Sequence, residues 1–170
     1  MMGELQVGLG DRSNVRTRFK GASSLVRVSV AIQAEWARIL NALMVPEYMD
    51  LWLAMPDVER LECCPEQRFA GGFRIDIFAG GREPKTIYGS CLRTRPNEIS
   101  YLWERTHGGN TARSVVKLRL RSGPRRCSLQ LWHHGLWNQR EIEWYSRMWQ
   151  KSLDRLRDVM ERMPRRVEQS

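Results

Sequence analysis

The chain has 170 residues, a hydrophobic fraction of 42% and a charged fraction of 28%, which predict one globular domain and exclude a disordered polypeptide. Its apolar runs fall far short of the roughly 20 residues of a membrane-spanning helix, and residues 1–10 lack the pattern of a signal peptide. The four cysteines have no CxxC spacing, and a domain of this size does not need disulfides, so we expect a cytoplasmic protein with reduced thiols. The net charge of +9 allows an acidic partner.

The N-terminal third predicts an arm, a strand and two short helices. Residues 1–24 carry Gly, Ser, Asn and charge without a sustained period, which indicates a flexible arm. Apolar and polar residues alternate over 25–30, as in a half-buried strand. Trp36, Ile39, Leu40 and Leu43 then share one helical face, and Pro46 suits the first turn of a second helix that leads to Trp52.

A two-residue period dominates the middle of the chain and predicts six strands. They span about residues 58–63, 72–78, 86–94, 98–104, 111–121 and 126–133, with Gly, Pro, Ser and Asn at the breaks between them. Because the links are short, we expect an antiparallel meander, since parallel strands need long crossovers.

The C-terminal segment predicts one long helix. Asn138 followed by Glu141 resembles a capping box, and Pro164 ends the pattern. An apolar stripe runs along the segment through Ile142, Tyr145, Trp149, Leu153, Leu156, Met160 and Met163. The domain is therefore expected to span residues 25–163, followed by a tail over 164–170.

These elements predict an α+β fold with a curved seven-stranded antiparallel sheet around the C-terminal helix. The order is strand, two helices, six strands and one helix. Only one long helix is available to cover the sheet, and a twisted sheet curls around such a helix. Because a rod about 10 Å across does not fill that trough, we expect a cavity between helix and sheet. A core packed to ordinary density is the alternative.

Several short motifs fall in the order seen in a known superfamily. They are Leu43 with Pro46 and Trp52, Gly71-Gly72-Phe73, Gly89 followed by Pro96, Tyr101 and Trp103, His133 with Gly135, and Trp149. Over residues 25–162 the chain resembles the helix-grip fold of the START-like (SRPBCC) superfamily, and within it the branch of the activator of heat-shock protein 90 ATPase. The resemblance implies a ligand cavity between sheet and helix, or a chaperone-associated interaction module, or an enzyme similar to polyketide cyclases and aromatases.

Strand alternation assigns a set of residues to the cavity. With two residues of the C-terminal helix, they are Phe73, Ile75, Ile77, Tyr101, Trp103, Val116, Leu118, Leu129, Leu131, His133, Tyr145 and Trp149. Among them His133 can contact a ligand or act as an acid or base, although a histidine satisfied within the core is the commoner case. Asp76 and Glu104 fall on the outer face by the same parity. The pattern therefore favours a binding protein over a catalyst.

Basic residues gather along two neighbouring predicted strands. This basic patch consists of Arg113, Lys117, Arg119, Arg121, Arg125 and Arg126. It fits an acidic protein partner, and its alternative is the solvated face of a strand pair. Nucleic acid is disfavoured because the patch lacks interleaved aromatic residues and a recognition-helix motif.

The leading hypothesis is a cytoplasmic protein that binds a small apolar or aromatic molecule between sheet and helix. The chaperone-associated module and the cyclase-like enzyme remain alternatives. His and Cys show no metal-ligand spacing, and neither GxxxxGK[ST], GxGxxG nor GxSxG occurs, so we expect no metal, no cofactor and no hydrolytic triad.

Overall fold

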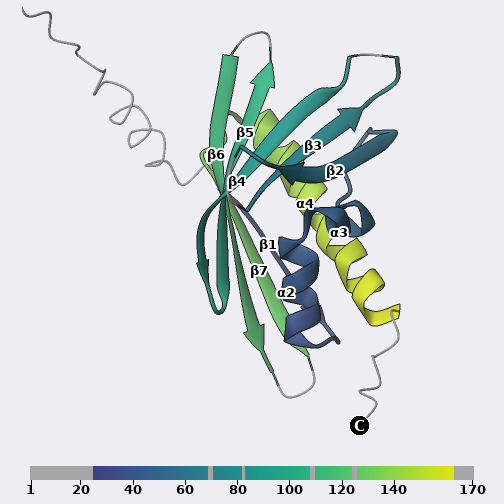
Figure 1. Ribbon diagram of the computed structural model, residues 1–170, viewed down its shortest axis with the longest axis vertical. Coiled ribbons are helices and arrows are strands. Elements are labelled where there is room, and N and C mark those ends of the chain that lie inside the picture. The colour runs from purple at the N-terminus through teal and green to yellow at the C-terminus, as the bar shows by residue number, and fades with distance from the viewer. Residues whose placement is uncertain (1–24, 69–70, 82, 108–109, 124–125, 163–170) are drawn as a thin grey trace, which may run out of the picture.

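The computed structural model of the protein describes residues 25–68, 71–81, 83–107, 110–123 and 126–162. The elements in these ranges follow the predicted order (Figure 1). They are β1 (Leu25–Ile32), α2 (Trp36–Met44), α3 (Pro46–Trp52), β2 (Arg60–Glu66), β3 (Gly72–Phe78), β4 (Lys85–Arg95), β5 (Glu98–His107), β6 (Asn110–Ser122), β7 (Cys127–His134) and α4 (Gln139–Arg162). The predicted arm over residues 1–24 and the tail over 164–170 lie outside the described residues.

The seven strands form one antiparallel sheet in the order β1-β7-β6-β5-β4-β3-β2. β2 to β7 form a meander, because each short link returns the chain beside the strand it has just left. β1 closes the far edge by pairing with β7, so that Leu25 lies opposite His134 and Ile32 opposite Cys127. The predicted helix-grip α+β fold is confirmed, with α4 lying along one face of the curved sheet (Figure 1).

The helix α4 begins at the predicted cap. The Asn138 side-chain oxygen accepts the backbone N–H of Glu141 at 2.9 Å, and the Glu141 carboxylate accepts the backbone N–H of Trp137 at 2.8 Å. Both contacts satisfy N–H groups at the start of the helix. The face turned to the sheet buries Tyr145, Met148, Trp149, Ser152, Leu153, Leu156 and Met160.

The helices α2 and α3 connect the two edges of the sheet and form a third wall beside α4. Pro46 occupies the first turn of α3, where its missing N–H costs nothing. The Trp52 indole N–H donates to the Ala42 carbonyl at 2.8 Å, which ties α3 to α2. The Ser152 hydroxyl of α4 exchanges hydrogen bonds with the backbone of Ala54 at 3.0 and 3.2 Å.

Several strands differ from their predicted bounds by up to three residues, as at the end of β5, and β2 and β4 also have features that were not predicted. β2 begins and ends later than expected and includes Pro65, which is tolerated because β2 is an edge strand that need not donate on its outer side. β4 carries a bulge between Cys91 and Arg93, where the register with β5 shifts. The sequence did not predict this bulge, because its only trace is a break in the alternation of apolar and polar residues, which can equally mark the end of a strand.

Candidate functional site

An apolar cavity lies where the sheet, α4 and the α2–α3 segment meet. Its lining residues are Leu43, Met49, Trp52, Leu53, Phe73, Ile75, Tyr101, Trp103, Val116, Leu118 and Trp149. Of the predicted cavity residues, the structure places these at the lining: Phe73, Ile75, Tyr101, Trp103, Val116, Leu118 and Trp149. The other predicted residues are buried elsewhere in the core: Ile77, Leu129, Leu131, His133 and Tyr145.

Four lining residues were not predicted, and all come from the α2–α3 segment or its end. Leu43, Met49, Trp52 and Leu53 are all at most 4% exposed. The helical period indicates that Leu43 is buried, but it does not reveal which surface α2 covers. The position of this third wall follows from β1 and β2 lying at opposite edges of the sheet.

The cavity has a volume of about 20 Å³, which is room for about one water molecule. This conformation therefore holds a much smaller space than the ligand-sized cavity that the fold led us to expect. The reason is the size of the rings in the trough. Phe73 meets Tyr101 and Trp103 edge-on at 5.2 and 5.7 Å between centroids, and Trp103 meets Trp149 at 5.4 Å.

His133 is fully buried beside this aromatic group, and both of its ring nitrogens have protein partners. The Trp149 indole can only donate, so His133 Nδ1 accepts from it at 3.0 Å. The proton therefore resides on Nε2, which donates to the Ser114 hydroxyl at 2.8 Å, and that hydroxyl donates to the Trp103 carbonyl at 3.4 Å. Burial, followed by the nearby Arg105 charge, lowers the pKa of His133 well below its ordinary value.

This hydrogen-bonding pattern corresponds to the commoner case considered for His133, a histidine satisfied within the core. A neutral imidazole with both nitrogens occupied has neither a lone pair nor a proton to offer a ligand. In this conformation His133 is a structural residue that joins β7 to β6 and α4.

The two buried tyrosines are engaged as well. The Tyr101 hydroxyl donates to the Leu43 carbonyl of α2 at 3.3 Å, and the Tyr145 hydroxyl accepts the Trp103 indole N–H at 3.2 Å. Burial raises the pKa of both phenols, and that of Tyr145 reaches about 12. Both side chains are therefore protonated at neutral pH.

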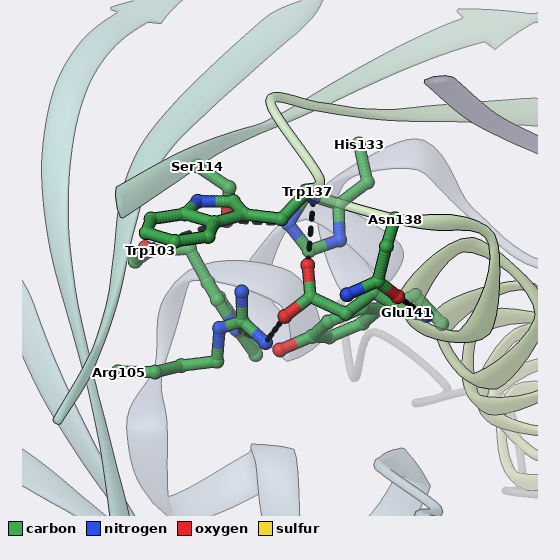
Figure 2. Close-up of polar contacts among 8 residues, drawn as sticks. Trp103, Arg105, Ser114, His133, Trp137, Asn138 and Glu141 are labelled. Carbon is green, nitrogen blue, oxygen red and sulfur yellow. Dashed lines mark hydrogen bonds and ion pairs between the residues drawn. The ribbon is translucent and has the colours of Figure 1, made fainter. Parts of the chain in front are cut away.

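An ion pair at the start of α4 was not predicted. Arg105 continues the inward-facing row of β5 formed by Ile99, Tyr101 and Trp103, and its Nη1 contacts Glu141 Oε1 at 2.7 Å (Figure 2). Burial acts to lower the pKa of Arg105, but Tyr145 and Glu141 outweigh it and raise that pKa. Strand parity carried two residues further would have found this arginine.

The members of the basic patch on β6 lie on the outer face of the sheet, and three of them pair with carboxylates. Arg113 contacts Glu104 at 2.9 Å, and Lys117 and Arg119 both contact Glu98 at 3.0 Å. Hydrogen bonds from Lys117 and then Arg119 lower the pKa of Glu98. Of the remaining members, the structure leaves Arg121 and Arg126 exposed, and Arg125 falls outside the described residues.

Neither a metal cluster nor a membrane span is found in the described part of the chain. No group of three or more His, Cys, Asp or Glu side chains within it is arranged to hold a metal ion. None of its helices combines the length and hydropathy that crossing a membrane requires.

No protein-family model and no curated protein matches the chain, but many solved structures share its fold. Protein CV1439 from Chromobacterium violaceum aligns with a TM-score of 0.71 at 18% identity, over 82% of this chain and 99% of its own. DynU16, from the dynemicin biosynthetic locus, aligns with a TM-score of 0.62 at 17% identity, over 82% of this chain and 48% of its own. The Aha1 dimer from Colwellia psychrerythraea aligns with a TM-score of 0.56 at 13% identity, over 81% and 96%. At these identities the likeness shows the helix-grip fold alone.

Proposed function

We propose that the protein is a cytoplasmic binding protein that holds a small apolar or aromatic molecule between the sheet, α4 and the α2–α3 segment. The observation that carries this proposal is the apolar cavity at the junction of these three walls, which has no charged lining residue. Its aromatic residues are Trp52, Phe73, Tyr101, Trp103 and Trp149. Flat rings offer edge and face contacts to an aromatic guest, and apolar burial contributes about 25 cal/mol per Å².

Binding requires the cavity to grow, and the α2–α3 segment is the wall that can move. The Tyr101–Leu43 hydrogen bond joins α2 to the sheet, and at 3.3 Å it is long for an O–H···O contact. The Asp50 side chain holds α3 to the edge strand β2 by accepting the Cys63 backbone N–H at 2.8 Å. Met49 fills the space from α3, and an unbranched methionine adapts its shape at low cost.

The test is a pair of variants on β6 that add the same ring at different places. Val116 lines the cavity, whereas Leu120, four residues along the same inner face, does not. We expect benzene, indole or 2-naphthamide to bind the wild type with 1:1 stoichiometry in native mass spectrometry and to raise its melting temperature. Val116→Phe should reduce the affinity at least about tenfold, because overpacking at the cavity removes the room that the probe needs.

Leu120→Phe is the matched control, since it also overpacks the core but leaves the cavity lining unchanged. It should lower the melting temperature while keeping the probe affinity of the wild type. Absence of binding by the whole probe series, or equal affinities in the two variants, would contradict the proposal.

The contacts of His133 and Tyr101 favour binding over catalysis. A cyclase-like enzyme needs a polar group free to exchange a proton with its substrate. His133 and the Tyr101 hydroxyl are the predicted candidates, and both are committed to internal hydrogen bonds.

A second candidate is a chaperone-associated interaction module, supported by the fold likeness to the Aha1 dimer and by exposed Arg121 and Arg126. If it holds, adding the protein should raise the ATPase rate of purified heat-shock protein 90. The charge reversals Arg121→Glu and Arg126→Glu together should remove most of that increase. Arg140→Glu with Arg147→Glu, on exposed positions of α4, is the charge-matched control. An unchanged ATPase rate would exclude the module.

A further inference from the structure

One edge of the Arg105 guanidinium has no partner among the described residues. Nη1 is bound to Glu141, whereas Nε and Nη2 are buried and make no hydrogen bond. The side chain as a whole is 20% exposed, so these two atoms are shielded while the group lies near the surface. Leaving a buried donor without an acceptor is unfavourable, and such groups are rare in folded proteins.

The two unpartnered atoms have the geometry of a carboxylate-binding site. Nε and Nη2 lie on the same side of the planar guanidinium, so their N–H groups point in parallel. A carboxylate accepts such a pair through both oxygens, and this bidentate arrangement is a strong, charge-assisted contact. Glu141 takes the opposite end of the group, so this edge lacks an acceptor. Because both atoms are buried, a carboxylate reaches them only when the side chains that cover them move.

Arg105 does not line the apolar cavity, but its neighbour Trp103 does. Trp103 precedes Arg105 by two residues on the same inner face of β5, and it lines the cavity. The Tyr145 ring lies beside the guanidinium at 5.2 Å from its centroid. Trp137, 55% exposed, stands at the start of α4 next to the ion pair (Figure 2). An aromatic acid entering here would meet the cation first and the rings behind it.

We propose that the ligand carries a carboxylate, which pairs with the Nε–Nη2 edge of Arg105 while its apolar body lies against Trp103. This inference rests on the proposed binding function and specifies the chemical class of the ligand. Arg105 would then make the protein bind anionic aromatic ligands more tightly than neutral ones. Glu141 opposes the incoming charge through its own carboxylate while holding the guanidinium in position.

The experiment compares two probes that share one ring system, 2-naphthoate and 2-naphthamide, by isothermal titration calorimetry at pH 7. In the wild type we expect 2-naphthoate to bind at least about tenfold more tightly, because only the anion forms the bidentate contact. Arg105→Met should remove this preference without changing the affinity for 2-naphthamide. Arg105→Lys should lose most of it, since an ammonium cannot form the paired contact.

Two further variants keep the test decisive. Arg113→Met removes an arginine on the outer face of the neighbouring strand and should retain the preference. Glu141→Gln neutralises the competing carboxylate and should tighten 2-naphthoate binding alone, which tests the inference even if the Arg105 variants fail to fold.

The outcomes separate the two proposals. Equal binding of both probes by the wild type, or a preference that survives in Arg105→Met, overturns the carboxylate inference and leaves the binding function intact. Absence of binding by both probes overturns the carboxylate inference, and it overturns the binding function as well only if benzene and indole also fail to bind.

Discussion

Replacing Gly89 by alanine is expected to lower the free energy of unfolding by about 1–3 kcal/mol, the usual cost of overpacking a core. Gly89 lies opposite Phe73 on β3 and Trp103 on β5. A Cβ atom at Gly89 would be 2.1 Å from Phe73 Cζ and 2.4 Å from both Cε atoms, so the ring must move. The cavity beside Phe73 is too small to receive it, and neighbouring rings must shift too. Urea denaturation with a linear extrapolation measures the change.

A double-mutant cycle shows whether Phe73 causes the loss. Phe73→Leu shortens the side chain, so adding Gly89→Ala to that background should cost at least about 1 kcal/mol less than in the wild type. Ser90→Ala, at the next position on the same strand, is the control and should change stability by no more than about 0.5 kcal/mol. Strictly additive effects of Phe73→Leu and Gly89→Ala would mean that the ring accommodates the new methyl group.

Acidification from pH 7 to pH 5 is expected to destabilise the wild type by up to about 2 kcal/mol through His133. The pKa of His133 in the folded state lies well below its ordinary value of about 6.5, to which it returns on unfolding. Below pH 6.5 His133 therefore binds a proton in the unfolded chain, whereas it stays neutral in the folded chain. The contribution of His133 to the free energy of unfolding is fully present above that pH, and the free energy of unfolding falls by up to about 1.4 kcal/mol per pH unit below it.

Thermal or urea unfolding of His133→Phe between pH 7 and pH 5 is the check. The variant should be less stable at pH 7, because the Trp149 indole and the Ser114 hydroxyl lose their partner, yet its acid sensitivity in this range should mostly disappear. His134→Gln is the control, since burial also lowers the pKa of His134, and it should keep most of the dependence. An identical pH profile for wild type and His133→Phe would assign the effect to other groups.

The sequence predicted the fold well because some of its motif residues make contacts across the sheet. Phe73 belongs to one motif and Gly89 with Trp103 to another, yet the three residues lie side by side on adjacent strands. Gly89 has no side chain because the Phe73 ring occupies that space. The residue types were therefore visible in the sequence, although the reason for them was not.

The candidate site was less predictable, because it depends on distances between side chains of different elements, and sequence periodicity contains no information about these distances. Alternation places residues on the correct face but does not state how far the rings extend, so the predicted cavity was larger than the observed one. Predicting that Met49 lines the cavity would require knowing the path of α2 and α3 across the sheet. The hydrogen-bond partners of His133 come from β6 and α4, which are distant in sequence. Glu141 was recognised only as a cap, although the same carboxylate also pairs with Arg105.

The pairing of β1 with β7 has a consequence for how the chain acquires its structure. Leu25 is opposite His134, more than one hundred positions later, whereas the other strand pairs join neighbours along the chain. During synthesis β1 leaves the ribosome long before its partner, with the apolar side chains of Val26, Val28 and Val30 uncovered. Because closing so long a loop is slow, we expect the meander to form first and the N-terminal strand to dock last, so the nascent chain would be exposed to aggregation until β7 is made.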